Sequence, residues 1–294
     1  MPRGSAFATR IDILHVTSYR YTGNVHLGPH RLMLQPREGS GVHLVSLEIL
    51  TNPPANLRWT EDVFGNSIVI AEFHSVAEKL IITARMDIEL RDGSEQSRTR
   101  YVGFPISYSD QERDALGVLT CQRYPDPDGK VKRWAAAFIY SIPTEAFALL
   151  GDLCLGVSTS VSYRSRDDFG TQSPQHTLER GWGACRDLAV LFAEAARSLG
   201  FGARIVSGYL FDPSGQSSGA GATHAWAEVY LPQTGWIAFD PTHAAASGTR
   251  LIPVAVGADI TDLPPVSGDF SGNGAAMSEM RVEVSVSQRP VVID

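Results

Sequence analysis

The N-terminal part of the chain alternates between apolar and polar positions with the period of a β-strand. From Ile11 to Tyr21 every second residue falls on one face, and similar alternation recurs over Val42–Ile49 and Leu80–Leu90. A period of two is typical of strands that bury one face and expose the other. The pattern predicts an N-terminal antiparallel β-sandwich of about seven strands over residues 1–95.

Beyond residue 130 the hydrophobic period changes to that of a helix. Helices are predicted over residues 131–140 and 144–161, and a third, amphipathic helix begins at Cys185 and ends before Gly200. The strands predicted in this part are residues 204–211, 223–230 and 235–242. A turn over residues 232–235 joins the last two strands as a hairpin. These elements predict helices packed on an antiparallel sheet, and with the N-terminal sandwich they indicate the fold class α+β.

Composition divides the rest of the chain. Residues 96–130 are first charged and then rich in Gly, Pro and Asp, which predicts a linker with one short helix. The helices and the hairpin define a core domain over residues 131–255, and a C-terminal extension follows over residues 256–294. This extension ends in an alternating segment, Arg281–Ser287, which predicts a final strand. The pattern does not say which sheet this strand joins.

Length and charge bound the possible functions. With 294 residues, of which 43% are hydrophobic, the chain can bury a substantial core. A formal net charge of -7 without a dense Lys/Arg cluster argues against a nucleic-acid partner. Because the chain has neither a signal-peptide pattern nor an apolar run of membrane-spanning length, we expect a cytoplasmic protein without membrane contact. The sequence predicts no oligomeric state.

The spacing of potential metal ligands predicts neither a metal site nor another cofactor. The cysteines Cys121, Cys154 and Cys185 are far apart and form no Cys-x-x-Cys pair, so neither a disulfide framework nor a structural zinc site is expected. The histidines of the N-terminal part lack the paired spacing of metal ligands. Cys154 lies on the apolar face of a predicted helix, which indicates a core residue.

The strongest chemical signal is the stretch Gly181-Trp182-Gly183-Ala184-Cys185, which places a thiol at the N-terminus of the third predicted helix. Free backbone N–H groups and the helix dipole favour negative charge there, so we expect the pKa of Cys185 to lie below the roughly 8.5 of a free cysteine. Gly181 and Gly183 remove side chains ahead of the sulfur, as close approach of a substrate requires. A lone cysteine on a helix can equally be a buried structural residue. Cys185 therefore needs partners before it counts as a candidate nucleophile.

The predicted hairpin supplies these partners. His224 lies near the start of one strand and Asp240 at the end of the next, so antiparallel pairing brings them to the same end. Together with the thiol they form the candidate catalytic set, with Cys185 as nucleophile, His224 as base and Asp240 as the orienting carboxylate. An aspartate before proline can also serve only to cap a turn. His176, in a polar loop predicted over residues 165–181, is the alternative base, but no carboxylate is predicted opposite it.

Four motifs in this order resemble the transglutaminase-like superfamily. They are Gly-x-Cys-Arg-Asp at residues 183–187, the strand 203–209, His224-Ala225-Trp226 and Phe239-Asp240-Pro241-Thr242. Residues 15–21 and 31–36 are similar to the domain that precedes this core in bacterial transglutaminase-like proteins. The resemblance implies a papain-like core after an N-terminal β domain. It also implies cysteine-dependent acyl transfer on peptide or glutamine-type amide bonds of a protein or peptide substrate.

The implied reaction passes through a thioester on Cys185. Its oxyanion would be held by the backbone N–H of Cys185 and by a second donor, for which the indole N–H of Trp182 is the candidate. Trp182 can equally be a packing residue. Arg186 and Asp187 suit surface and helix-dipole roles better than catalysis.

Other residues are candidates for contacts with the substrate. We assign His176 and Tyr209 to the substrate rim. The residues Asp212–Gly221 form a loop directly before His224, and this loop is either a lid or a solvated connection.

The molecule that takes the acyl group from the thioester determines the type of reaction. If water resolves the thioester, the protein is a protease or amidase, and if an amine does, it is a protein-glutamine gamma-glutamyltransferase. Hydrolysis is favoured because water is always present, whereas an amine acceptor needs its own binding groove. The non-enzymatic alternative is a binding module on the same fold, whose expected signature is a missing member of the triad. All three members are present here.

Overall fold

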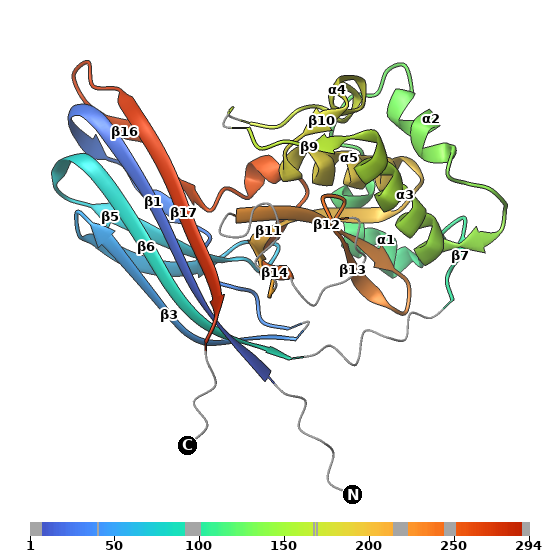
Figure 1. Cartoon of the computed structure of the whole chain (residues 1–294), viewed down its shortest axis with the longest axis horizontal. Helices are drawn as coiled ribbons and strands as arrows, with labels where there is room; N and C mark the ends of the chain where they lie inside the picture. The colour runs from blue at the N-terminus through green and yellow to red at the C-terminus, as the bar shows by residue number, and fades with distance from the viewer. Residues whose placement is uncertain are drawn as a thin grey trace, which may run out of the picture.

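The structure is a computed structural model and describes residues 8–39, 41–91, 101–166, 168, 170–213, 223–243 and 251–289. Figure 1 shows two parts side by side, a β-sandwich and a domain in which helices pack on a separate sheet. This architecture confirms the predicted α+β class.

Two antiparallel sheets form the sandwich. The larger sheet has the order β16-β1-β6-β3, with β17 also paired to β1, and the smaller has the order β15-β2-β5-β4. Their strands are β1 (Ala8–Leu27), β2 (His30–Leu32), β3 (Val42–Asn52), β4 (Ala55–Glu61), β5 (Ser67–Phe73), β6 (Val76–Arg91), β15 (Val266–Ser267), β16 (Phe270–Ser271) and β17 (Met277–Gln288). Alternating apolar residues such as Ile13 and Ile82 are buried between the sheets. The predicted N-terminal sandwich is confirmed.

The C-terminal extension completes this sandwich. β17 runs antiparallel to β1, with Val286 opposite Ile13 and Val282 opposite Thr17. β15 and β16 pair with β2 and β1 respectively. Val284 and Val286 of β17 pack against the sandwich core, whereas Val282 is 42% exposed. The final strand therefore joins the sheet of the N-terminal domain.

The core domain has a four-stranded antiparallel sheet of order β13-β12-β11-β14. Its elements are β7 (Gly103–Phe104), α1 (Asp110–Leu116), η1 (Gly117–Thr120), α2 (Lys130–Ala136), β8 (Thr144–Glu145), α3 (Ala146–Ser160), β9 (Ser162–Tyr163), α4 (Pro174–Arg180), β10 (Trp182–Gly183), α5 (Cys185–Ser198), β11 (Gly202–Leu210), β12 (Thr223–Leu231), β13 (Gly235–Phe239), β14 (Leu251–Gly257) and η2 (Ile260–Asp262). α5 lies against β11 and β12, and α2, α3 and α4 pack on α5 (Figure 1). Within the described residues, every helix is too short or too polar to cross a bilayer.

Much of the segment predicted as a linker belongs to the core domain. β7 pairs with β8, and the ring of Phe104 stacks on that of Phe201 with centroids 5.6 Å apart. Leu116 and Leu119 are also buried. These few apolar residues are separated by charged and turn residues, so they give no clear period.

The polar loop predicted over residues 165–181 contains a helix, α4. The side chain of Ser173 accepts the N–H of His176, Pro174 occupies the first helical position, and Gly181 ends the helix in the left-handed conformation. With 7 residues, α4 is too short for its period to show in the sequence.

A buried interface joins the sandwich to the core sheet. The fully buried amide of Asn66 donates to the carbonyl of Val256 at 2.7 Å and accepts its N–H at 2.8 Å, as a neighbouring strand would. His15 of β1 lies 3.0 Å from the hydroxyl of Tyr209 in β11. Apolar residues of β11 and β14, such as Ile252, belong to the same cluster as the sandwich core. The sandwich therefore supports β11, the neighbour of the strand that carries His224.

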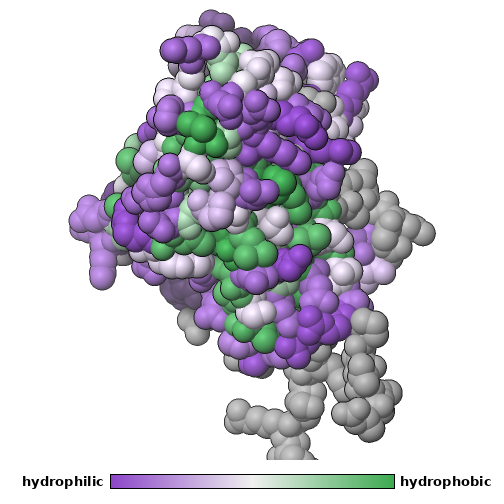
Figure 2. All heavy atoms as spheres, turned by 90° about the vertical axis from the view of Figure 1, so that its left-hand side faces the viewer, coloured by the Kyte–Doolittle hydropathy of each residue, from purple (hydrophilic) through white to green (hydrophobic). Residues whose placement is uncertain are grey.

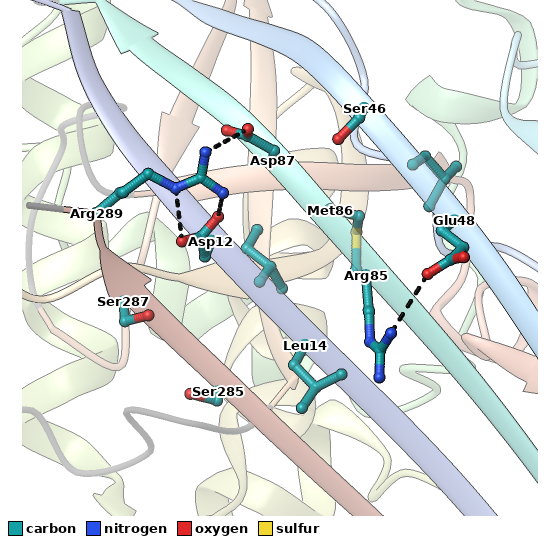
Figure 3. A pocket seen from close by; sticks show the side chains of 12 residues that line it. Asp12, Leu14, Ser46, Glu48, Arg85, Met86, Asp87, Ser285, Ser287 and Arg289 are labelled. Atoms are coloured by element: carbon teal, nitrogen blue, oxygen red, sulfur yellow. Dashed lines mark hydrogen bonds and ion pairs between the residues drawn. The ribbon is translucent and has the colours of Figure 1, made fainter.

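The outer face of the larger sheet is exposed. Figure 2 shows apolar side chains in the middle of this face and hydrophilic ones around them, and Leu14 is 39% exposed there. A hollow of about 410 Å³ lies on the same face, where Arg289 bonds to Asp12 and Asp87 (Figure 3). Its lining comes from β1, β3, β6, β17 and the segment after β17. The hollow thus belongs to the sandwich and not to the domain that carries Cys185.

Candidate active site

Cys185 is the first residue of α5, as predicted. The preceding Ala184 is extended, and its N–H donates to the carboxylate of Asp187 at 2.8 Å. A first-turn carboxylate that reaches back in this way satisfies a free donor of the helix start. Leu188 and Phe192 are buried, so the apolar face of α5 holds the helix against the sheet. The thiol is therefore presented from an anchored helix start.

Asp187 is buried beneath the loop that precedes α4, and its carboxylate accepts several hydrogen bonds from that loop. Its side chain is 0% exposed, and Arg166 binds its two oxygens, Nε to Oδ2 and Nη2 to Oδ1, at 2.8 Å each. The Thr171 hydroxyl and the Gln172 N–H also donate to Oδ1 at 2.8 Å. Burial alone would raise the pKa of Asp187, but Arg166 and the N–H donors lower it to about 2. The position in the first turn fits the helix dipole, whereas the predicted surface role is wrong because the loop closes over the carboxylate.

The side chain of Arg186 binds backbone carbonyl groups of the same loop. Its Nε donates to the carbonyl of Gly170 at 2.8 Å, and its Nη2 donates to the carbonyl of Asp168 at 2.7 Å. Two consecutive residues of α5, directly after the thiol, therefore fasten the loop to the helix start.

Packing accounts for the two glycines ahead of the thiol. Gly181 has a φ of 67°, the left-handed conformation that closes α4. A Cβ on Gly183 would lie 2.8 Å from the Cβ of Asp187, so β10 approaches α5 this closely only without a side chain. Close approach of a substrate stays a prediction.

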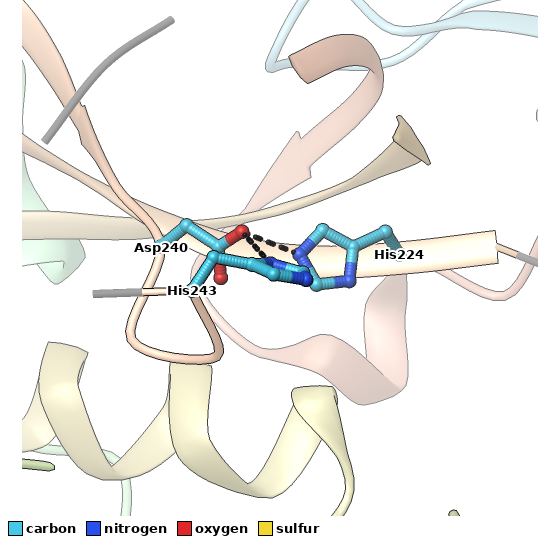
Figure 4. A group of neighbouring side chains, drawn as sticks. All are labelled: His224, Asp240 and His243. Atoms are coloured by element: carbon cyan, nitrogen blue, oxygen red, sulfur yellow. Dashed lines mark hydrogen bonds and ion pairs between the residues drawn. The ribbon is translucent and has the colours of Figure 1, made fainter. Parts of the chain in front are cut away.

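His224 and Asp240 lie at the same end of the β12–β13 hairpin. The register pairs Ala227 with Phe239, which brings the residue after β13 beside the start of β12. His224 Nε2 lies 2.8 Å from Asp240 Oδ2, and the two residues are 7% and 2% exposed. Figure 4 shows the two side chains pointing toward each other. Their predicted proximity is confirmed.

The thiol, the imidazole and the carboxylate form one coupled set. Burial alone would raise the pKa of Cys185, but a hydrogen bond with His224 and the N–H of Ala225 bring it below its usual value. Burial alone would lower the pKa of His224, but its bonds to Asp240 and Cys185 raise it to about 10. Burial alone would raise the pKa of Asp240, but the bonds from His224 and His243 hold it well below the usual range. These directions favour a thiolate and an imidazolium next to a carboxylate.

The hydrogen bonds define the roles of the two ring nitrogens of His224. An ionised carboxylate only accepts, so Nε2 carries the proton that faces Asp240. The bond with the Cys185 thiol is then left to Nδ1. This is the arrangement that a base needs, because Nδ1 can take the thiol proton while Nε2 keeps its own hydrogen and its hydrogen bond to the carboxylate.

A second histidine, which the sequence pattern did not reveal, bonds to the same carboxylate oxygen. His243 Nδ1 lies 2.8 Å from Asp240 Oδ2, and the Thr242 N–H donates to Oδ1 at 2.9 Å. The rings of His243 and His224 pack in a T-shaped arrangement, with their centroids 5.3 Å apart (Figure 4). The available signal was the spacing, because a residue three positions after Asp240 in a turn can return its side chain to that carboxylate.

These three side chains also have the spacing of a possible metal-binding group. In the described part of the chain, ligand atoms of His224, Asp240 and His243 lie within 4.8 Å of one another. Each imidazole already donates to the carboxylate at 2.8 Å, and these hydrogen bonds account for the close spacing. We therefore assign no ion to this group.

Tyr209 does not lie on a substrate rim, so that prediction is wrong. The residue is 1% exposed, and its hydroxyl lies against His15 at the domain interface. β11 lies inside the core sheet, with helix α5 packed on it and residues of the sandwich clustered with its side chains. Because both faces of this strand are covered, the Tyr209 side chain is not available to a substrate rim.

The roles of His176 and Trp182 remain predictions. His176 is exposed on α4, and the imidazole bonded to Cys185 is that of His224. The ring of Trp182 is half-buried, with the guanidinium of Arg180 3.7 Å from its centroid. This contact engages the ring face and leaves the role of the indole N–H untested.

The other two cysteines differ from Cys185. Cys154 is buried on α3, as predicted, and burial raises the pKa of its thiol to about 12. Cys121 is exposed, and its sulfur lies 4.0 Å from the carbonyl oxygen of Gly117. Most of the predicted lid or connection, from residue 214 onward, lies outside the described residues.

Comparison with known proteins places this site in a family. Residues 132–241 match the model of the transglutaminase-like superfamily, and residues 11–89 match that of the bacterial transglutaminase-like N-terminal region. The site is therefore a cysteine, histidine and aspartate set on a transglutaminase-like core. The chain therefore has a transglutaminase-like core domain preceded by the bacterial transglutaminase-like N-terminal region.

Individual relatives extend the similarity over the whole chain. The uncharacterized protein Rv2569c of Mycobacterium tuberculosis (strain ATCC 25618 / H37Rv) is 29% identical over 299 residues, covering 96% of this chain and 93% of its own. The uncharacterized protein ML0607 of Mycobacterium leprae (strain TN) is 37% identical over 106 residues, covering 35% of this chain and 37% of its own.

A crystal structure from Cytophaga hutchinsonii, of a protein provisionally named a cysteine protease, has a TM-score of 0.72. Its sequence identity is 19%, and the match covers 98% of this chain and 93% of that one. At this identity the likeness establishes the fold. The match to the transglutaminase-like core supports cysteine-type acyl transfer or hydrolysis as the general class of chemistry.

Proposed function

We propose that this protein is a cysteine-dependent hydrolase that cleaves peptide or glutamine-type amide bonds in a protein or peptide substrate through a thioester. The observation that carries the proposal is the position of His224, which bonds to Asp240 at 2.8 Å and interacts with the Cys185 thiol. Burying an imidazole and a carboxylate costs free energy unless they are paired. A module that only binds a partner has no need of such a set beside a thiol, and this favours an enzyme.

The first half-reaction forms the thioester. The Cys185 thiolate attacks the amide carbonyl carbon, and the carbonyl oxygen becomes an oxyanion that accepts the backbone N–H of Cys185. Trp182 remains the candidate second donor. When the tetrahedral intermediate collapses, the C–N bond breaks and the nitrogen leaves as an amine or ammonia with a proton from His224 Nδ1.

The second half-reaction releases the acid. His224 Nδ1, now neutral, takes a proton from water while the water oxygen attacks the thioester carbonyl. The C–S bond breaks, the carboxylic acid leaves, and the thiolate and the imidazolium are restored. Throughout, Asp240 accepts Nε2–H and stabilises the imidazolium by its charge.

Selective alkylation tests the nucleophile. We expect iodoacetamide near neutral pH to label Cys185 faster than the exposed Cys121, because the His224 imidazole favours the thiolate of Cys185. Peptide mapping over a time course measures both rates in the same sample. Labelling of Cys121 at the same rate or faster would contradict the proposal, and so would a His224→Ala variant that labels like the wild type.

Product analysis tests the acceptor. A glutamine-containing protein substrate is incubated with a labelled primary amine, and ammonia release, acid formation and amine incorporation are measured together. Hydrolysis predicts acid without amine incorporation, and a gamma-glutamyltransferase predicts incorporation that grows with amine concentration. Absence of any product with both peptide and glutamine substrates, despite selective alkylation, would contradict catalysis on these bonds. The Cys185→Ala variant supplies the blank.

A further inference from the structure

Two imidazoles share one carboxylate oxygen in this site. Nε2 of His224 and Nδ1 of His243 each lie 2.8 Å from Oδ2 of Asp240 (Figure 4), and the Thr242 N–H holds Oδ1 at 2.9 Å. We propose that His243 is a positioning residue, whose Nδ1–H fixes the orientation of the Asp240 carboxylate and limits how strongly that carboxylate holds the His224 ring. This inference rests on the proposed function, because it assigns a role within the same site.

His243 donates from Nδ1 to the carboxylate of Asp240. The carboxylate of Asp240 is ionised and can only accept, so the nitrogen that faces it carries a hydrogen. Nε2 of His243 is buried and has no hydrogen-bond partner among the described residues. The hydrogen-bond partners thus place a hydrogen on Nδ1, the nitrogen that faces an acceptor.

The surrounding titratable and charged groups leave this arrangement intact. α5 contributes Cys185 and Arg186, and the charge of Arg186 acts on the thiol. α3 contributes Cys154, which stays neutral because burial raises its pKa to about 12. β9 contributes Tyr163, which interacts with Cys185 and whose pKa burial also raises. Within the described residues, none of these groups bonds to the oxygen that the two imidazoles share.

The two imidazole N–H groups compete for the negative charge of one carboxylate oxygen, Oδ2 of Asp240. A donor that stabilises an anion reduces the stabilisation that the anion gives to its other partners. Without His243 the charge of Asp240 acts more fully on His224, so the imidazolium forms more easily and returns its proton less readily. Thiolate formation then moves to lower pH, while Nδ1 becomes slower to exchange protons during turnover. A histidine that only packs in the turn would cause neither change.

Two variants of His243 separate the effect of its N–H donor from the effect of its ring. His243→Ala removes the N–H, whereas His243→Asn places an amide N–H close to the position of Nδ1. We expect His243→Ala to shift the pH profile of Cys185 alkylation down by about half a pH unit or more. We also expect kcat to fall about threefold or more with KM unchanged, because the proposed role of His243 acts on proton transfer through Asp240. His243→Asn should restore both values, and His26→Ala, on an exposed histidine of the sandwich, should change neither.

The outcomes are decisive in both directions. An unchanged alkylation profile in His243→Ala overturns the proposal, and so does a shift that His243→Asn fails to reverse. If either variant fails to fold, nitrogen-15 spectra of the histidine rings in the wild-type protein decide. We expect Nδ1 of His243 to carry a proton, and the opposite tautomer overturns the proposal. Alkylation and ring spectra need no turnover, so absence of amide hydrolysis would count against the proposed function alone.

Discussion

Arg166 and Asp187 form a two-point ion pair beneath the loop that leads to the candidate nucleophile, with both N–O distances at 2.8 Å. The two side chains are 8% and 0% exposed. Removing one partner of a buried pair leaves an uncompensated charge and typically costs about 3–5 kcal/mol. We therefore expect Arg166→Met to lower the free energy of unfolding by about 3 kcal/mol. Alkylation of Cys185 should also slow, because the loop loses its anchor. Urea unfolding and alkylation kinetics measure the two effects.

A surface pair provides the matched control. Arg113 and Asp110 are 2.7 Å apart with side chains 60% and 97% exposed. Exposed pairs contribute little to stability, so Arg113→Met should unfold like the wild type. Equal losses in Arg113→Met and Arg166→Met, or no loss in either, would contradict the structural role assigned to Asp187.

The same ion pair shows where prediction from the sequence ends. The start of α5 and the β12–β13 hairpin depend on neighbours in the chain, so hydrophobic period and turn residues predicted them. The proximity of His224 and Asp240 followed from the short turn of that hairpin. The burial of Asp187 depends on Arg166, 21 residues earlier in a loop without a period. Its side chain therefore looked like an ordinary first-turn carboxylate.

Long-range packing explains the other differences. Alternation predicted β17, but its partner β1 lies at the opposite end of the chain, with Ile11 opposite Gln288. The sequence predicted β11 as a strand without showing that both of its faces are covered, so it did not reveal that Tyr209 is buried. His243 follows a predicted site residue by three positions, and only the turn geometry shows that its ring returns to Asp240.

The buried and the reactive thiol should separate stability from activity. Cys185→Ala should abolish turnover and leave the melting temperature nearly unchanged, because a thiol at a helix start contributes little packing. Cys154→Ala should retain turnover but lose about 1 kcal/mol or more of unfolding free energy, because its sulfur is buried on α3. Turnover and thermal unfolding of both variants test this. Activity that survives in Cys185→Ala and disappears in Cys154→Ala would reverse the assignment.

Asp240→Asn tests the orienting carboxylate. The substitution keeps the shape and the acceptor for the Thr242 N–H, but it removes the charge and can present an N–H to the His224 ring. We expect the acylation rate to fall at least about tenfold in a protein that is still folded at the assay temperature. Serine triads lose about 10⁴-fold in this test, and a thiolate favoured by a helix start should depend less on its orienter. A near-normal rate, or a loss that unfolding matches, would leave only a Cys185 and His224 pair.

His15 should make the protein acid-sensitive at the interface between its two domains. Its ring is 1% exposed and bonded to Tyr209 and Thr17, and burial lowers its pKa to about 4. Between pH 6.5, its ordinary pKa, and about 4 the unfolded chain binds a proton that the folded protein does not. Stability contributed by the neutral ring is therefore present above about pH 6.5 and is lost as the pH falls through this window.

The loss attributable to His15 by pH 4 should be on the order of 3 kcal/mol. His224 acts in a separate window, because its raised pKa gives stability that is complete below pH 6.5 and is lost as the pH rises toward about 10. We expect His15→Gln to flatten the dependence of unfolding free energy on pH between about 6.5 and 4, whatever its offset at neutral pH. His176→Gln, on an exposed helix face, should keep the wild-type slope. Urea unfolding at a series of pH values measures these slopes, and an unaltered slope in His15→Gln would place the acid-sensitive group elsewhere.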